Sequence, residues 1–188
     1  MTQAPQDELT GLRQLLHRSA IVDVLHRYCR AVDRLDPALL ATCYHPDGTD
    51  DHGIFEGSAA DYVTWVMAYV GQWHSTHHDI SNPMIELDDD DHAVCESHWT
   101  GWYRLPAGAE GGDNEVVDLV SCGRYLDRFE RRGGEWRIAH RVCVSDWSHA
   151  YPPSMPRPTQ RLSGRRGPDD LVHQLRQLEL GRAGHGGS

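Results

Sequence analysis

The stretch VDLVSCGRYLDRF, residues 117–129, alternates between two kinds of side chain. Six of the seven alternate positions carry an apolar, aromatic or small residue, and Asp127 is the exception: Val117, Leu119, Ser121, Gly123, Tyr125 and Phe129. Successive side chains of a β-strand point to opposite faces, so the alternation predicts a long strand with one face toward an interior. Small residues between aromatic ones leave room on that face for a flat apolar ligand.

Three neighbouring segments show the same alternation, and short turn-forming runs separate them. We expect strands over 74–87, 93–105, 115–130 and 135–147. The turns between them are expected at 88–91, 106–113 and 132–134. Four long strands in immediate succession, each reversed by a turn, predict an antiparallel meander.

Helical patterns precede these strands. Over 8–35, apolar residues recur at spacings of three and four. Asp36 and Pro37 read as the cap and first turn of a short helix ending at Cys43. A turn is expected at 45–48, a short strand or extended loop at 49–55, and a third helix from Ser58 to about Tyr69. Helices followed by a meander predict an α+β fold.

The composition excludes several kinds of partner and chemistry. The 18 basic residues are all Arg, so a lysine Schiff base and a phosphate-loop lysine are excluded. A net charge of -10 argues against nucleic-acid and anionic-membrane partners, and no apolar run reaches the roughly 18 residues that span a bilayer. The N-terminus lacks the pattern of a signal peptide. Five scattered cysteines without a CxxC motif fit reduced thiols, so we expect a cytoplasmic protein.

The composition changes after the last expected strand. Residues 1–151 are expected to form one domain, since they hold all the periodic segments. Residues 152–188 are rich in Pro, Arg and Gly, with a possible helix at 169–180. We interpret them as a tail that is partly disordered or packed on a neighbouring subunit.

Asp33 and His78 are the strongest candidates for catalysis. A carboxylate held against an imidazole can move a proton from carbon or oxygen without a metal or an organic cofactor. Two other interpretations stay open: Asp33 as a solvated carboxylate at a helix end, and His78 as a structural histidine. Tyr28 lies about 140° from Asp33 on an ideal helix, so the two reach one ligand only if the cavity runs along the helix.

Other residues are assigned to the pocket from the faces of the expected strands. Arg141 is a candidate pocket cation, with Asp146 and Asp127 as possible partners. The residues expected to bind the substrate are Phe55, Asn82, Met84, Trp99, Tyr103, Tyr125 and Trp147. A metal is the alternative, because His45, Asp47, Asp50, Asp51 and His52 lie close together in the sequence. They lack the ligand spacing of a known metal site, so we expect none.

A series of short motifs runs through the chain. In order these are Tyr28-xxxx-Asp33, Tyr44-His-Pro-Asp47, Asp51-His-Gly53 with Phe55-Glu-Gly57, Thr76-His-His78-xxx-Asn82, Ile85-Glu-Leu87, Gly123-Arg-Tyr125-Leu-Asp-Arg-Phe129, and Trp136-Arg-Ile-Ala-His-Arg141 with Asp146-Trp147. In these motifs the chain resembles the SnoaL-like branch of the nuclear transport factor 2-like superfamily over about residues 10–151. The resemblance implies a cone-shaped α+β barrel, in which three N-terminal helices pack on a curved, mostly antiparallel sheet around a deep pocket.

The resemblance also implies a chemistry. Enzymes of this family use an Asp–His dyad for cofactor-free proton abstraction and elimination. Carried over, Asp33 orients His78, His78 is the base, Tyr28 polarises a substrate oxygen, and Arg141 is a pocket arginine. The dehydrochlorinases of the family use a lysine, which this chain lacks, so halide elimination is disfavoured.

We therefore expect a cofactor-independent lyase. It would be a dehydratase that acts on a hydrophobic cyclic ketone or alcohol of polyketide or steroid type, in a homodimer or homotrimer. The same dyad without a leaving group would give a double-bond isomerase or a polyketide cyclase. Because the family includes non-catalytic subunits, the rival from another class is a small-ligand-binding or accessory subunit.

Overall fold

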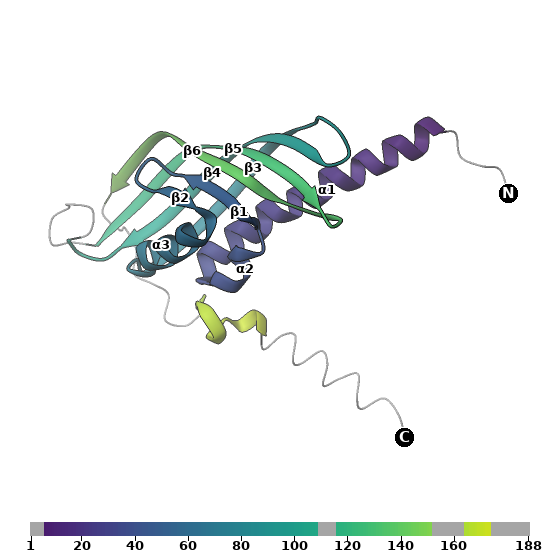
Figure 1. Ribbon diagram of the computed structural model, residues 1–188. Coiled ribbons are helices and arrows are strands. Elements are labelled where there is room, and N and C mark those ends of the chain that lie inside the picture. Colours follow the sequence, from purple (N-terminus) through teal and green to yellow (C-terminus); the bar gives the residue numbers. More distant parts are fainter. Residues whose placement is uncertain (1–5, 109–115, 152–163, 174–188) are drawn as a thin grey trace, which may run out of the picture.

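A curved sheet wraps around three helices in the computed structural model of the chain (Figure 1). The structure describes residues 6–108, 116–151 and 164–173. The helices are α1 (Gln6–Arg34), α2 (Pro37–Ala41) and α3 (Ala59–Gly71). The strands are β1 (Tyr44–Asp51), β2 (Glu56–Ser58), β3 (Ser75–Leu87), β4 (His92–Leu105), β5 (Val117–Arg132) and β6 (Glu135–Tyr151). The predicted α+β fold is confirmed, but the helices do not all precede the sheet, because β1 and β2 lie between α2 and α3 in the chain.

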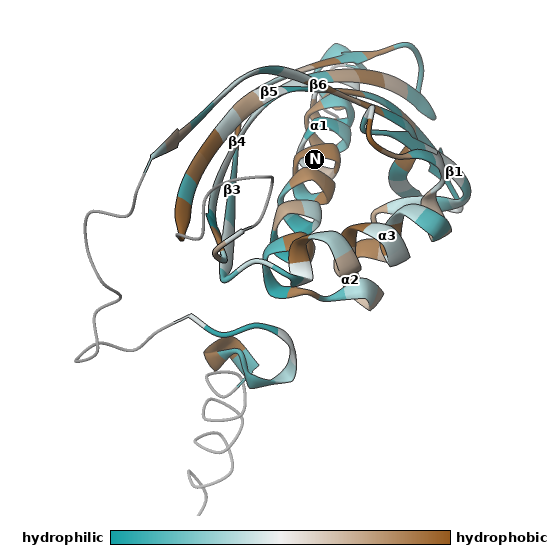
Figure 2. Cartoon of the chain, turned by 90° about the vertical axis from the view of Figure 1, so that its left-hand side faces the viewer, coloured by the Kyte–Doolittle hydropathy of each residue, from teal (hydrophilic) through white to brown (hydrophobic). Residues whose placement is uncertain are grey.

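The strands form one six-stranded sheet in the order β2-β1-β6-β5-β4-β3. Viewed from one side, the sheet curves like an arch over α1, with α2 and α3 below (Figure 2). Strands β3 to β6 are the predicted antiparallel meander. β1 pairs antiparallel with β2 and parallel with β6, so the sheet is mostly antiparallel and cone-like.

The turn predicted at 45–48 is wrong. These residues lie within β1, in the stretch where its pairing with β6 shifts register between Tyr44 and Thr49. Pro and Gly are tolerated there because an irregular ladder leaves backbone groups without regular partners. Pro46 and Gly48 mark the irregularity in the sequence. The strand continues through it because β1 pairs with β6 on both sides.

α1 buries only its C-terminal half against the sheet. Ile21, Val24 and Leu25 are fully buried, whereas Leu12, Leu15 and Leu16 are exposed. The first turns of α1 extend past the edge of the sheet (Figure 1), so nothing in the described structure covers them. The residues near the end of the helix therefore face the interior, and Asp33 is one of them.

Local signals set the ends of the helices. Leu35 adopts a left-handed backbone conformation that ends α1, and Asp36 caps α2 by accepting from the Leu39 amide at 2.9 Å. Ser58 caps α3 by accepting from the Asp61 amide at 3.1 Å. The predicted caps are thus confirmed.

Three interruptions in the ladders change which residues face the interior. In β3 the register shifts between Ser81 and Met84, where Asn82 has a left-handed backbone. In β6 it shifts at Ala139 and again at Asp146, each of which has no partner in β5. An extra residue in one strand reverses the alternation beyond it.

The segment 164–173 packs on the same chain. Arg166 donates to the carbonyls of Val70 and Trp73 at 3.2 and 3.0 Å, and Arg34 pairs with Asp170 at 3.3 Å. This segment therefore lies where α1 and α3 end. The helix predicted at 169–180 falls largely outside the described residues. Among the described residues, no helix is long and apolar enough to span a membrane.

Candidate active site

Asp33 and His78 contact each other where α1 meets β3. Asp33 Oδ1 lies 2.7 Å from His78 Nδ1, and Asp33 Oδ2 accepts the backbone N–H of His78 at 2.9 Å. Each side chain is only 8% exposed. Two hydrogen bonds between the same two residues fix the plane of the imidazole as well as its position.

The hydrogen bonds also fix the charge of Asp33. Burial alone would raise the pKa of this carboxyl group, but hydrogen bonds and charge from His78, with a further hydrogen bond from Thr76, lower it overall. Asp33 is therefore a carboxylate near neutral pH, and it accepts a proton-bearing Nδ1. In a neutral imidazole, Nε2 is then the nitrogen that can take up a proton.

The Nε2 atom of His78 faces the hydroxyl of Tyr103 at 3.1 Å. Burial raises the pKa of Tyr103, so the hydroxyl is neutral and donates to Nε2. The ring of Tyr103 lies across Gly101, where an added Cβ would be 1.8 Å from the tyrosine oxygen. Gly101 pairs with His78 in the ladder, so the missing side chain is what lets Tyr103 reach the imidazole.

His78 and Tyr103 border an aromatic cavity of about 90 Å³. Eight aromatic side chains from both the helices and the sheet line it: Tyr28, Tyr62, Trp65, Tyr69, Trp73, Trp99, Tyr103 and Tyr125. Two imidazoles, His52 and His78, are also in its wall. A proton acceptor in a largely apolar wall can act on a carbon acid that water would otherwise solvate.

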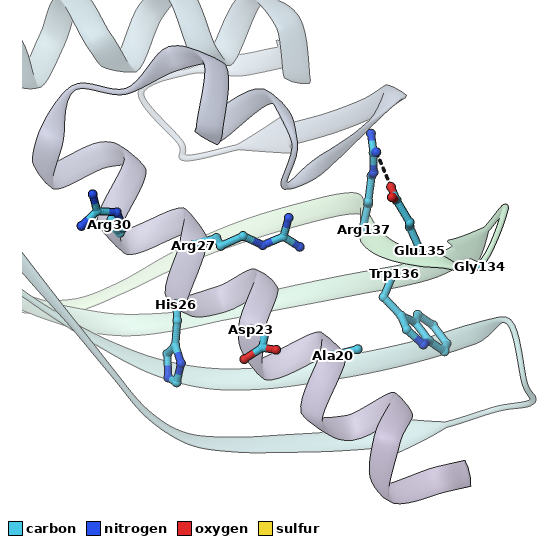
Figure 3. Close-up of a pocket in the computed structure, with 9 residues that line it drawn as sticks. All are labelled: Ala20, Asp23, His26, Arg27, Arg30, Gly134, Glu135, Trp136 and Arg137. Carbon is cyan, nitrogen blue, oxygen red and sulfur yellow. Dashed lines mark hydrogen bonds and ion pairs between the residues drawn. The ribbon is translucent and has the colours of Figure 1, made fainter. Parts of the chain in front are cut away.

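A larger open groove, of about 580 Å³, lies along the other side of α1 (Figure 3). It runs between α1 and the start of β6, where Arg137 pairs with Glu135. Charged side chains such as Asp23, Arg27 and Arg30 line it. The residues predicted to act on a substrate are absent from this groove, so the aromatic cavity is the better candidate site.

Comparison with known proteins identifies the fold family. Residues 13–142 match the family model of the SnoaL-like domain. The chain belongs to the SnoaL-like family. No curated protein sequence matches it.

Several solved structures share the SnoaL-like fold at low sequence identity. A hexachlorocyclohexane dehydrochlorinase from Novosphingobium barchaimii is 20% identical with a TM-score of 0.66, over 79% of this chain and 99% of that one. A putative scytalone dehydratase from Novosphingobium aromaticivorans is 19% identical with a TM-score of 0.63, over 81% of this chain and 99% of that one. The beta subunit of a putative aromatic-ring-hydroxylating dioxygenase from the same species is 20% identical with a TM-score of 0.56, over 71% and 92%.

Some of the expected substrate-binding residues of this SnoaL-like chain do line the cavity. Trp99, Tyr103 and Tyr125 are in its wall, and Tyr28 reaches it from α1 despite its 140° offset from Asp33. Asp33 is not part of this wall, so it can act on a ligand in the cavity only through His78. Phe55 lies behind the wall instead, with its ring 5.5 Å from that of Tyr62.

The expectation that Asn82, Met84 and Trp147 line the pocket is wrong. Asn82 occupies the irregular position in β3 and is exposed. Met84 follows it and is 67% exposed, because the shift turns it to the outer face of the sheet. Trp147 follows the shift at Asp146 and is 56% exposed beside Cys122.

The assignment of Arg141 needs a correction as well. The residue faces inward, as expected, but its side chain is fully buried below the cavity instead of lining it. Its guanidinium lies 4.1 Å from the ring centre of Tyr28 and 3.9 Å from that of Tyr125. It also donates twice to Asp127, both at 2.7 Å. Arg141 therefore holds two tyrosines of the wall in place.

His52 lines the cavity although it is not among the residues predicted from the sequence to bind the substrate. In the sequence, Asp50 and His52 belong to the cluster that offers a metal site as the alternative. In the structure, other members of that cluster bond to residues elsewhere in the chain. His45 bonds to the Glu130 carbonyl at 2.9 Å and Asp47 to Arg132 at 2.6 Å. Within the described ranges, no group of three or more His, Cys, Asp or Glu side chains is placed to hold a metal ion. The signal for His52 was its spacing: residues two apart in an extended segment share a face.

Arg166 connects the segment 164–173 to the site. It donates to the hydroxyl of Thr76 at 3.0 Å, and Thr76 in turn contributes a hydrogen bond to Asp33. Arg166 is half-buried, and burial lowers its pKa while the charge of Asp33 opposes that change. The segment thus places a positive charge next to the carboxylate of the dyad.

Proposed function

We propose that this SnoaL-like protein is a cofactor-independent lyase that dehydrates a hydrophobic cyclic ketone or alcohol. The observation that carries the proposal is the Asp33–His78 pair, with Nε2 of the imidazole at the wall of an aromatic cavity. His78 takes a proton from the carbon next to a carbonyl group. Asp33 stabilises the imidazolium that forms, because its carboxylate bonds to Nδ1.

Two tyrosines can donate hydrogen bonds to the oxygen atoms of the substrate. Tyr28 donates to the oxygen of the leaving hydroxyl, on which negative charge develops as the C–O bond breaks, and one such donor is typically worth about 3 kcal/mol. Tyr103 already occupies Nε2 of His78, so a substrate must displace this hydroxyl before it transfers its proton. The displaced hydroxyl stays within reach of the bound ring and can donate a hydrogen bond to its carbonyl oxygen.

The volume of the cavity limits the substrate. About 90 Å³ is well below the roughly 300 Å³ at which typical ligand sites begin. A single reacting ring is the part that the cavity encloses. The remainder of a polyketide or steroid would extend out past the side chains at the mouth, such as Ile54.

The first test is exchange of solvent deuterium into cyclic ketones. The wild type should label the carbon next to the carbonyl group, and dehydrate those ketones that carry a β-hydroxyl. Asp33→Asn and His78→Ala should each lower exchange by about 10²- to 10⁴-fold, the usual contribution of a positioned base. Exchange that continues at the full rate in both variants would overturn the mechanism.

A matched control is available on the outer face of β3. His77 pairs with Asp79 at 3.1 Å, as His78 pairs with Asp33, but its side chain is 63% exposed. His77→Ala should leave exchange unchanged. A protein that only carries a ligand, or serves as an accessory subunit, would bind the ketone without labelling it.

A further inference from the structure

A second histidine–aspartate pair lies in the wall of the same cavity. His52 Nδ1 bonds to Asp50 Oδ1, and the other oxygen of Asp50 accepts the hydroxyl of Tyr44. Asp50 is 1% exposed, and each oxygen of this deeply buried carboxylate takes part in one of these hydrogen bonds. The turn after β1 holds the imidazole, since the His52 amide bonds to the Phe55 carbonyl at 2.8 Å and Gly53 supplies the left-handed backbone between them.

Hydrogen bonds connect this pair to Tyr28. His52 Nε2 lies 3.2 Å from the hydroxyl of Tyr62, and that hydroxyl bonds directly to the hydroxyl of Tyr28. The rings of His52 and Tyr62 stack with their centres 4.8 Å apart. The chain His52–Tyr62–Tyr28 thus ends at the tyrosine proposed above to meet the substrate oxygen.

The number of protons on His52 decides the direction of the hydrogen bonds along His52–Tyr62–Tyr28. Burial raises the pKa of Tyr28, Tyr44 and Tyr62, so each is a neutral hydroxyl with one hydrogen to donate. When His52 is neutral, Tyr62 donates to its Nε2 and Tyr28 donates to Tyr62, which leaves the substrate no donor. When His52 is protonated, it donates to Tyr62, Tyr62 donates to Tyr28, and the hydrogen of Tyr28 is free for the cavity.

We propose that the His52–Asp50 pair supplies the proton that the leaving hydroxyl needs, through Tyr62 and Tyr28. This inference rests on the proposed dehydratase function and divides it between two pairs. His78–Asp33 removes the proton from carbon, and His52–Asp50 delivers a proton to oxygen. Tyr28 touches the substrate, whereas His52 and Asp50 are positioning residues that act through it.

The step balances without any other reactant. His78 Nε2 takes the proton from carbon, the C–H electrons form the double bond, and the C–O bond breaks. The departing oxygen takes the hydrogen of Tyr28, Tyr28 takes that of Tyr62, and Tyr62 takes the proton of His52 Nε2. Water leaves, His52 is neutral and His78 is an imidazolium. Loss of one proton from His78 to solvent and uptake of one by His52 restore the starting state.

Titratable groups from three elements surround His52. They are Asp50 from β1, Tyr62 from α3, and Tyr125 and Asp127 from β5. Burial raises the pKa of Tyr62 and Tyr125, so both hydroxyls are neutral and the negative charge beside the imidazole comes from Asp50.

The test separates proton removal from loss of the hydroxyl. Cyclohexanone in deuterated buffer reports exchange alone, and 3-hydroxycyclohexanone reports elimination to the enone. Asp50→Asn, His52→Gln and Tyr62→Phe should lower elimination by about 100-fold or more while exchange stays close to the wild-type rate.

The outcomes distinguish the two proposals. Equal loss of exchange and elimination in these variants, or no loss of elimination, would overturn the inference and leave the role of His78 intact. Absence of exchange in the wild type would remove the proposed function and this inference with it. Asp89→Asn is the matched control, because it breaks an exposed histidine–aspartate pair at the β3–β4 turn and should change neither rate.

Folding of the variants can be checked without activity. A histidine N–H bonded to a buried carboxylate gives a proton resonance shifted far downfield. The wild type should show one such signal from each buried pair. Asp50→Asn should remove one and Asp33→Asn the other, and the surviving signal shows that the rest of the site is formed.

Discussion

Two arginine–aspartate pairs join neighbouring strands with the same hydrogen-bond geometry. One pair lies below the cavity, and the other lies on the outer face of the sheet. Arg141 donates from Nε and Nη2 to Asp127 at 2.7 and 2.7 Å, and Arg104 donates from the same atoms to Asp118 at 2.6 and 2.7 Å. Each pair joins directly opposed residues of adjacent strands. The side chains of the first pair are 0% exposed, and those of the second are 30% and 21% exposed.

Burial decides what these identical hydrogen bonds are worth. Burial alone would lower the pKa of Arg141, but the charge of Asp127 raises it well above its ordinary value, so the guanidinium stays charged in the interior. Removing one member of a buried pair strands a charge that water cannot reach. On the outer face, water solvates whichever partner remains. The Asp33–His78 pair, at 8% exposure, lies between the two.

The largest effect should come from Arg141→Ala. This change leaves Asp127 buried without its partner and removes the cation between two tyrosine rings, so it should lower the free energy of unfolding by about 3–5 kcal/mol. Urea unfolding followed by fluorescence measures this. The double variant Arg141→Met with Asp127→Leu should recover most of the loss, because no charge is left in the core. A loss below about 1 kcal/mol in the single variant would show that the interior solvates Asp127 in some other way.

The stability that the Asp33–His78 pair contributes should depend on pH. The pKa of Asp33 is lowered in the folded protein, so the stability it contributes is present above its unfolded pKa, near 4. That stability is lost as the pH falls through the lower folded value. Asp33→Asn should therefore cost about 1–3 kcal/mol at pH 6, and the difference from the wild type should shrink in acid. Denaturant unfolding of both proteins from pH 6 to pH 3 gives this comparison, and a difference that stays constant with pH would contradict it.

The smallest effect should come from Arg104→Ala, at about 0–1 kcal/mol. The remaining Asp118 lies on the outer face, where its carboxylate regains water. The contribution should fall further in 1 M salt, since salt screens exposed charges. Thermal unfolding at low and high salt tests this. A loss as large as that of Arg141→Ala would mean that the outer face is covered in solution.

The sequence predicted much of the fold because its signals are local. Helix caps at Asp36 and Ser58, the apolar period of α1 and the turns between the long strands depend on residues close together in the chain. The contact between Asp33 and His78 could be expected for a different reason: the family motifs name both residues. Their catalytic roles stay proposals.

The errors concern which face a side chain takes, and that depends on the neighbouring strand. Arg137 and Arg141 share a face in a regular strand, but the extra residue at Ala139 places Ile138 and Arg141 together inside. Only the pairing with β5 shows this. The shift in β3 had a sequence signal, since Asn82-Pro83 interrupts an otherwise regular strand. His52 was missed although an extended segment is predicted at 49–55, because only the pairing of β1 with β6 shows which face of this segment meets the cavity.

The parallel contact of β1 with β6 sets the order in which the protein can be completed during synthesis. β1 has two neighbours in the sheet: β2, which offers three paired residues, and β6, the last strand in the part of the chain that the structure describes. A ribosome has made every other strand before β1 finds its main partner, and closing so long a loop is slow. The wall that carries Asp50 and His52 is thus the last part of the cavity to close, after the wall with Asp33 and His78 can already have formed.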